Sequence, residues 1–177
     1  INNIGLLAPK TTNIKLIYNE KKIDFIFQER IVKEFLERNR FIEGPIIKGD
    51  ERYSFNYFKY DQNEIAKISK HKLSNGAWAN KTYNNLKVAK KALKILNFIN
   101  YFYSSEIDEK LLVDYYSASL NEENNKYFSK LPVFDAMMYS LGAVHNLSKD
   151  DRRFYYDSNF EIFYPIYYDG DINIINS

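Results

Sequence analysis

The alternation of apolar and polar residues near the start of the chain predicts a β-hairpin that runs into a helix. Residues Ile14–Tyr18 and Ile23–Phe27 alternate as strands do, and the polar residues 19–22 between them form a turn signal. Over Glu29–Asn39 the period changes to that of a helix. The apolar residues of this segment fall on one helical face: Ile31, Val32, Phe35 and Leu36.

Short apolar runs after this helix, Ile46–Lys48 and Tyr53–Phe58, predict two further strands, so residues 1–60 are expected to form a small sheet with one inserted helix. The later spacing is helical and predicts a helical body, with Thr82 as the N-cap of its longest helix. The predicted helices are Asn63–Leu73, a long helix from Thr82 to about Tyr103, Glu106–Leu120, and a last helix that starts near Pro132, packs Phe134, Met137, Met138 and Leu141 inward and ends at Gly142.

Two aromatic runs near the end of the chain predict a second hairpin. They are Phe154–Tyr156 and Ile162–Tyr168, and an Asp-Ser-Asn turn signal separates them. Together with the earlier sheet and the helical body, this hairpin indicates an α+β fold class.

The composition bounds the protein without naming its function. A chain of 177 residues with 45% hydrophobic and 17% aromatic residues is expected to fold as one domain, or part of one, with a sizeable core. A net charge of +2 implies neither a nucleic acid nor an anionic membrane as partner. The absence of cysteine excludes disulfides, thiol catalysis and thiolate metal sites. No apolar run reaches the roughly 18 residues that a membrane span needs.

One side of the long predicted helix is basic, and two isolated residues also invite a functional interpretation. The basic side could bind nucleic acid or a membrane, or it could be an ordinary solvated surface. No aromatic or arginine pattern accompanies it, which favours the solvated surface. His71 and Trp78 show no partner pattern and are interpreted as structural. The lysines of the basic helix side are Lys87, Lys90, Lys91 and Lys94.

The candidate chemistry lies in the stretch 142–171, GAVHNLSKDDRRFYYDSNFEIFYPIYYDGD. A hairpin brings its two ends together, so His145, Asp150 and Asp151 are expected near Asp169 and Asp171. Oxygen ligands on loops that a rigid hairpin holds suit a hard divalent cation, and Mg²⁺ brings phosphates with it. The stretch therefore predicts a site for a metal ion and phosphate.

Each of these residues also has a simpler interpretation. Asp169 and Asp171 could form a turn after the strand, and His145 could end a helix with a favourable dipole interaction. The loop aspartates could be solvated. Arg152 and Arg153 alternate in direction along a strand, so only one of them can face the cleft and pair with a carboxylate or phosphate.

The predicted elements follow the order of a two-lobed kinase. A small sheet with a helix comes first, then a helical body, a loop with acidic residues, a hairpin and a further acidic residue. Neither G-x-G-x-x-G nor a Walker sequence occurs. That absence argues against an ordinary protein kinase or P-loop enzyme, and less strongly against an atypical kinase.

Three segments resemble the CotH family, the spore-coat kinase-like proteins and their bacterial relatives. The first is GLLAPKTTNIKLIYNEKKIDFIFQERIVKEFLERNRFIEGPIIK, similar to the family's strand, turn, strand, Glu and helix. The second, LGAVHNLSKDDRRFYYD, is similar to its catalytic loop, and the third, FYPIYYDGD, to its P-x-x-x-D-x-D metal segment. Together they span roughly Gly5 to Asp171.

The resemblance implies an atypical protein-kinase-like fold that transfers the γ-phosphate of ATP, with Mg²⁺, to Ser or Thr hydroxyls of a protein substrate. It implies one domain over 1–177, with a small-lobe part at 1–60 and a helical lobe with the catalytic hairpin at 61–177. It also points to a bacterial spore-coat, envelope or exported setting. Because residue 1 is isoleucine and the sequence stops within an apolar segment, the chain is expected to be a piece of a longer protein, truncated at both ends.

Residue by residue, the resemblance makes Asp169 the metal-binding aspartate, with Asp171 assisting. Glu29 would open the small-lobe helix as a nucleotide-orienting acid, or would be an ordinary helix-start acid, and Lys48 could reach a phosphate. The chain departs from the family at two positions. His145 stands where many members have Asp, and it could accept the acceptor's proton or mark a site that has lost catalysis. Asp151 stands where relatives have an Asn metal ligand.

The predicted function is therefore Mg²⁺-dependent phosphoryl transfer. Asp151, Asp169 and Asp171 would hold the metal, His145 would orient or deprotonate the hydroxyl, and one arginine of the 152–153 pair would neutralise charge. Two alternatives stay open: a pseudokinase that binds nucleotide without turnover, and a surface or coat-assembly scaffold that uses its Tyr-rich strands for contact.

Overall fold

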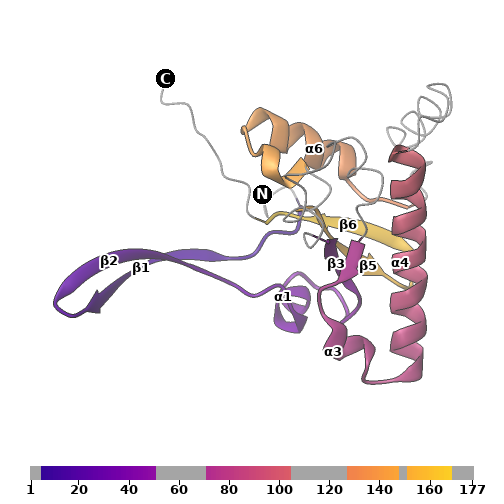
Figure 1. Ribbon diagram of the computed structural model, residues 1–177, viewed down its shortest axis with the longest axis horizontal. Coiled ribbons are helices and arrows are strands. Elements are labelled where there is room, and N and C mark those ends of the chain that lie inside the picture. The colour runs from indigo at the N-terminus through magenta and orange to yellow at the C-terminus, as the bar shows by residue number, and fades with distance from the viewer. Residues whose placement is uncertain (1–4, 51–70, 105–126, 148–150, 169–177) are drawn as a thin grey trace, which may run out of the picture.

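The computed structural model describes residues 5–50, 71–104, 127–147 and 151–168, and it is a mixed α+β protein with two antiparallel sheets (Figure 1). The elements in chain order are β1 (Thr11–Tyr18), β2 (Lys21–Gln28), α1 (Lys33–Arg38), β3 (Ile46–Gly49), β4 (His71–Leu73), α3 (Gly76–Ala79), α4 (Tyr83–Ser104), α6 (Leu131–Ser140), the 3₁₀ turn η3 (Val144–Leu147), β5 (Arg153–Asp157) and β6 (Ile162–Ile166). The α+β prediction is confirmed. Among the described residues, no helix is both long enough and apolar enough to cross a membrane.

The first predicted hairpin is confirmed as β1 and β2, which pair in continuous register from Thr11 opposite Gln28 to Tyr18 opposite Lys21. The turn consists of Asn19 and Glu20, with φ of 48° and 63°. Two positive φ angles give a turn the twist that matches paired strands, and asparagine tolerates this conformation well. The hairpin extends away from the four-stranded sheet and its helices (Figure 1).

The second sheet has the order β4-β3-β5-β6, and every neighbouring pair is antiparallel. The hairpin predicted at 154–168 is confirmed as β5 and β6. The predicted helix Asn63–Leu73 is wrong over 71–73, because this segment is strand β4, with Leu73 opposite Ile47. Strand pairing with β3 outweighs the local helical spacing here. The remainder of that predicted helix, the strand at 53–58 and the helix at 106–120 lie outside the described residues.

The two faces of this sheet belong to different core clusters. One face packs against α4 through Ile47, Phe154 and Phe163, which join Leu96 and Ile99 of the helix. The other face packs against α1. Its cluster consists of Leu7, Ile31, Phe35, Leu36, Ile46, Tyr155 and Ile166. Alternate residues of β3 and β5 therefore enter opposite cores, as a strand covered on both faces requires.

The helix α1 is shorter than the predicted 29–39, although its inward residues Phe35 and Leu36 are fully buried as expected. Residues 29 and 30 precede it as non-helical chain. Gly44 then brings the backbone close to the sheet, and an added Cβ there would lie 2.9 Å from the ring of Tyr155. The Tyr155 hydroxyl donates to the Ile42 carbonyl at 3.0 Å, which fastens this segment to β5.

The long helix α4 begins one residue after Thr82, as predicted. The Thr82 hydroxyl accepts a hydrogen bond from the Asn85 backbone N–H at 3.0 Å, which satisfies one N–H of the first turn. The four lysines of the basic side are exposed, and Lys91 pairs with Glu161 in the turn between β5 and β6.

Replacing Thr82 with alanine is expected to lower the free energy of unfolding by about 1 kcal/mol, because the Asn85 N–H loses its acceptor. Urea denaturation followed by far-UV circular dichroism measures this change. Thr82→Ser keeps the hydroxyl and is the matched control. An equal loss in both variants would contradict the capping role.

The last predicted helix is confirmed as α6, which has Pro132 in its first turn and buries Phe134 and Met138. Its last residue is Ser140, and Gly142 stops the chain from continuing as helix, with a φ of 67° in the left-handed conformation that glycine adopts without strain. The chain then enters η3, which leads to the loop before β5.

Candidate functional site

The late hairpin is a rigid support for the residues around it. Tyr155, Tyr156 and Phe163 are almost completely buried. At the turn, the Asp157 carboxylate accepts the backbone N–H of Asn159 at 2.9 Å, which closes the predicted Asp-Ser-Asn turn. The other end of the hairpin pairs Arg153 with Ile166. The segments that carry the candidate residues enter and leave the sheet at that end.

Three cationic side chains form a row across the sheet at this end. Lys48 of β3 lies directly opposite Lys72 of β4 on one side and Arg153 of β5 on the other. Directly opposed residues project from the same face with Cβ atoms about 5 Å apart. All three side chains are half-buried. We call these three residues the cationic row.

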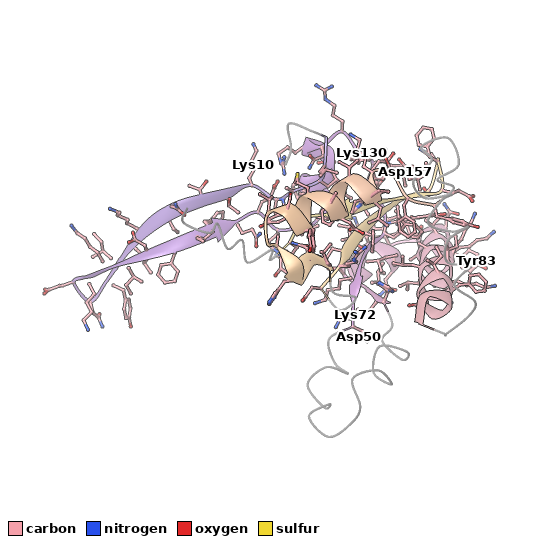
Figure 2. The ribbon with its side chains drawn as sticks, turned by 90° about the horizontal axis from the view of Figure 1, so that it is seen from above. Lys10, Asp50, Lys72, Tyr83, Lys130 and Asp157 are labelled. Atoms are coloured by element: carbon pink, nitrogen blue, oxygen red, sulfur yellow. The ribbon has the colours of Figure 1, made fainter. Side chains whose placement is uncertain are left out.

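Like charges placed opposite one another are unfavourable unless anions compensate them. One compensating anion is Asp50, which is 3% exposed and holds the Lys72 ammonium at 3.0 Å (Figure 2). Arg153 is placed over an aromatic ring, with its guanidinium carbon 3.2 Å from the centroid of Tyr168. The row therefore suits an anionic group with several oxygens, such as a phosphate.

The loop before the hairpin is tied to the chain that leaves it. Asn146 of η3 is completely buried, and its Oδ1 accepts the backbone N–H of Tyr168 at 3.1 Å. Tyr168 is thus held by Asn146 and by Arg153. The side-chain Nδ2 of Asn146 has no acceptor among the described residues. This hydrogen bond joins the segments that enter and leave the hairpin. The expected proximity of the loop residues to Asp169 and Asp171 stays a prediction, because these two aspartates lie outside the described residues.

Arg152 and Arg153 point in different directions, as their alternation predicts. Arg152 donates from Nη2 to Asp135 of α6 at 3.0 Å and from Nε to the Leu147 carbonyl at 3.2 Å, so it fastens the loop to the helix. Burial raises the pKa of the Asp135 carboxyl, and the Arg152 guanidinium opposes that rise. Arg153 instead lies in the cationic row, directly opposite Lys48. Of the two arginines, Arg153 is therefore the one placed beside Lys48.

The other candidate residues of this loop are His145, Asp150 and Asp151. His145 lies in η3 with an exposed side chain, and Asp151 is half-buried just before β5. Asp150 lies outside the described residues. Within the described ranges, no three or more His, Asp or Glu side chains lie together in a way that could hold a metal ion. The predicted metal ligands and the predicted phosphate contact of Lys48 both stay predictions.

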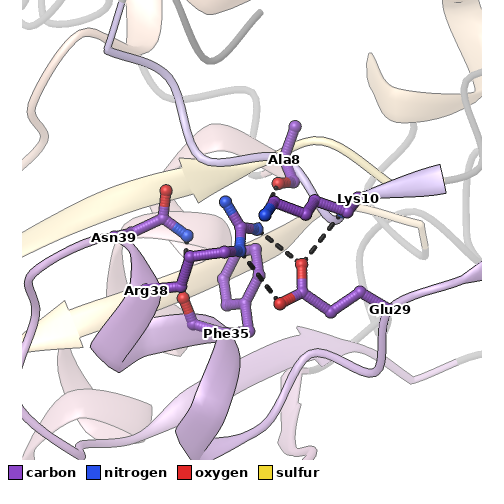
Figure 3. A network of polar contacts seen from close by, with 6 residues as sticks. All are labelled: Ala8, Lys10, Glu29, Phe35, Arg38 and Asn39. Atoms are coloured by element: carbon purple, nitrogen blue, oxygen red, sulfur yellow. Dashed lines mark hydrogen bonds and ion pairs between the residues drawn. The ribbon is translucent and has the colours of Figure 1, made fainter.

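Glu29 does not open a helix, because α1 starts at Lys33. Its carboxylate lies at the base of the first hairpin and binds Arg38 of α1, with Nε to Oε1 at 3.0 Å, and the backbone N–H of Lys10 at 2.9 Å (Figure 3). Arg38 also donates to the Ala8 carbonyl at 3.0 Å. The Glu29 carboxylate thus joins the two ends of the first hairpin to α1, whereas the sequence suggested either a nucleotide-orienting acid or an ordinary helix-start acid.

The hydrogen bond from Arg38 lowers the pKa of the Glu29 carboxyl below its ordinary value of 4.5; burial opposes this, and the Lys10 N–H adds to it. A carboxylate with a lowered pKa stabilises the fold above its ordinary pKa, and this contribution is lost as the pH falls through the lowered one. Glu29→Gln is therefore expected to cost about 1–2 kcal/mol at neutral pH and progressively less below pH 4.5.

Urea denaturation of both proteins across this pH range measures the difference. Glu37→Gln is the matched control, since Glu37 forms an exposed pair with Lys33 at 3.4 Å and such pairs contribute little. A difference between Glu29→Gln and the parent protein that does not change with pH would contradict the assignment.

Sequence reasoning missed Lys72, Asp50, Asn146 and Asp135. Lys72 was missed because residues 71–73 were predicted as helical, and no alternation of apolar and polar residues marks this three-residue strand. Asn146 directly follows the candidate histidine in a stretch whose other residues, Ala143, Val144 and Leu147, are apolar, and that setting could have marked it as a buried polar anchor. Asp50 and Asp135 owe their roles to partners far away in the sequence.

Comparison of the sequence with protein-family models and with curated proteins finds no match.

Proposed function

We propose that this protein is a CotH-like atypical kinase, which transfers the γ-phosphate of ATP to a serine or threonine hydroxyl of a protein. The observation that carries this proposal is the cationic row of Lys48, Lys72 and Arg153 beside Tyr168, the residue just before Asp169. Neighbouring lysine and arginine side chains, here Lys48 and Arg153, suit a polyphosphate because both residue types can bind phosphate oxygens, whereas Lys72 is paired with Asp50. The resemblance of three segments to the CotH family supports the same function.

In the proposed reaction the acceptor hydroxyl oxygen attacks the γ-phosphorus, and the bond between that phosphorus and the bridging oxygen of ADP breaks. His145 accepts the hydroxyl proton, and ADP leaves with the bridging oxygen. An exposed histidine suits this role, because the hydroxyl belongs to another protein. Lys48 and Arg153 bind phosphate oxygens and stabilise the charge that they carry during the transfer.

The metal ligands of the proposed site are Asp151, Asp169 and Asp171. They would hold Mg²⁺, which supplies charge neutralisation at the phosphates. Asp151 is half-buried at the start of β5, and Asp169 follows Tyr168 in the sequence. Asn146 and Arg152 position this part of the chain, through the Tyr168 N–H and through Asp135.

Binding of Mg-ATP is expected to raise the melting temperature of the protein, and Lys48→Ala is expected to weaken that binding at least about tenfold by removing a charged phosphate contact. Differential scanning fluorimetry against Mg-ATP concentration measures both. Lys87→Ala, on the exposed side of α4, is the matched control. A melting temperature that does not change with Mg-ATP concentration would contradict the proposed function and favour the scaffold alternative.

The pseudokinase alternative predicts a different combination of results. It predicts the same rise in melting temperature with Mg-ATP, no labelled phosphate on protein, and no functional loss on His145→Ala. An assay with γ-labelled ATP on the parent protein and on His145→Ala therefore distinguishes an active kinase from a nucleotide-binding relative that has lost turnover.

A further inference from the structure

The first hairpin, residues 11–28, carries a continuous apolar face that stays exposed in the described part of the chain. We call this hairpin the arm. Every residue of β1 and all of β2 except Gln28 are exposed. The register places alternate residues of both strands on one face. Six large hydrophobic side chains lie on it, each between 41% and 64% exposed: Ile14, Leu16, Tyr18, Ile23, Phe25 and Phe27.

The opposite face of the arm is mainly polar. At its centre Lys15 lies directly opposite Asp24, an opposite-charge pair that is typical of a solvent-exposed face. The large hydrophobic residues on this face are Ile17 and Ile26. The contrast between the faces is the alternation of a sheet with one buried and one solvated side. The apolar face is therefore built to be covered.

A two-stranded hairpin of this kind is marginal in water without a covering layer. Folded proteins also avoid large contiguous exposed apolar patches unless these bind a partner. They protect exposed strands with prolines, bulges or charges on the apolar side. The arm has an uninterrupted eight-pair register, and Lys21 at the tip is the charged residue of its apolar face. Figures 1 and 2 show the arm extending away from the sheet, so a partner can reach this face.

We propose that the apolar face of the arm packs against the same face of a second copy of this chain, in a two-fold symmetric dimer. Burial of the six side chains would remove about 600 Å² from each copy, given their exposed fractions and their size. The total of about 1,200 Å² is what a specific interface of modest affinity needs.

The charges of the arm favour an antiparallel arrangement of the two copies. In that arrangement Phe25 of one copy packs on Ile23 of the other, so large and smaller side chains interdigitate. Lys21 then lies over Phe27 of the other copy, where its ammonium gains a cation–π contact. The two tips, which carry Lys21 and Lys22, stay apart. The antiparallel arrangement also places the two four-stranded sheets at opposite ends of the paired arms.

A membrane surface suits the arm less well. Peripheral membrane elements combine an apolar face with a strongly basic polar face. Here the polar face holds a neutral Lys15–Asp24 pair, and Glu20 at the turn offsets one of the tip lysines. The whole chain carries a net charge of only +2.

Sedimentation velocity of the 177-residue chain, from low micromolar to near-millimolar concentration, tests the proposal. We expect a concentration-dependent monomer–dimer equilibrium. Phe25→Glu places a charge in the middle of the apolar face and is expected to weaken association at least about tenfold. Ile26→Glu is the matched control, because it places the same charge one residue away on the opposite face and is expected to leave association unchanged.

Leu16→Glu, on the other strand of the same apolar face, is a second test and is expected to act as Phe25→Glu does. Circular dichroism confirms that each variant folds. A monomer at all concentrations, or equal weakening by Phe25→Glu and Ile26→Glu, would overturn the proposal. So would a monomer that binds vesicles of phosphatidylcholine and phosphatidylglycerol through this face. No nucleotide is present, so failure here leaves the proposed kinase function untouched.

Discussion

Replacing Asp169 with alanine is expected to lower incorporation of labelled phosphate into protein by at least about 100-fold. The reason is that removal of one pre-positioned group that stabilises transition-state charge costs about two to three orders of magnitude in rate. In the proposed site Asp169 holds Mg²⁺ against phosphates that the cationic row binds. Incubation with γ-labelled ATP and Mg²⁺, followed by autoradiography of separated proteins, measures the incorporation.

Glu34→Ala is the control for this experiment, because Glu34 is an exposed carboxylate on α1. It is expected to retain the parent activity. Incorporation that survives Asp169→Ala would remove the proposed mechanism. If Asp169→Ala abolishes incorporation while Mg-ATP still raises the melting temperature of this variant, the metal role of Asp169 is separate from the phosphate contacts of Lys48 and Arg153.

Replacing Phe163 with alanine is expected to lower the free energy of unfolding by about 3–5 kcal/mol. The Phe163 side chain is completely buried between the sheet and α4. Its ring lies 5.5 Å from that of Phe128, 6.2 Å from Phe154 and 4.8 Å from Tyr156, measured between centroids. The substitution therefore removes both buried area and several aromatic contacts. Urea denaturation followed by tryptophan fluorescence measures the loss.

Phe160 provides a matched control for this substitution. It lies at the turn of the same hairpin and is 70% exposed. Phe160→Ala is expected to change the free energy of unfolding by no more than about 0.5 kcal/mol. Equal destabilisation by the two substitutions would show that the cluster around Phe163 is not a main stabilising core.

Several elements could be predicted because their signals are local. The two hairpins follow from strand alternation around Asn19–Glu20 and around the Asp157 turn. The start of α4 follows from the Thr82 cap, and the end of α6 follows from Gly142. In each case the residues that decide the conformation are within a few positions of one another.

Other features could not be predicted because their causes are distant in sequence. His71–Leu73 forms a strand because β3 offers it a pairing edge. The Glu29 carboxylate binds Arg38 and the Lys10 N–H because the arm and α1 converge at that point. For the candidate site, the sequence named Lys48 and Arg153 separately, and only the register showed that they are neighbours.

The amino-acid sequence by itself determined the α+β class, the two hairpins, the start of α4, the end of α6, and the residue types from which a phosphate site could be built. The tertiary structure decided that β3 lies between β4 and β5, and thereby that Lys48, Lys72 and Arg153 form one row. The physical reason is that turn, cap and periodicity signals act over one or two turns of chain. Strand order and register depend on which buried faces fit together across the whole fold.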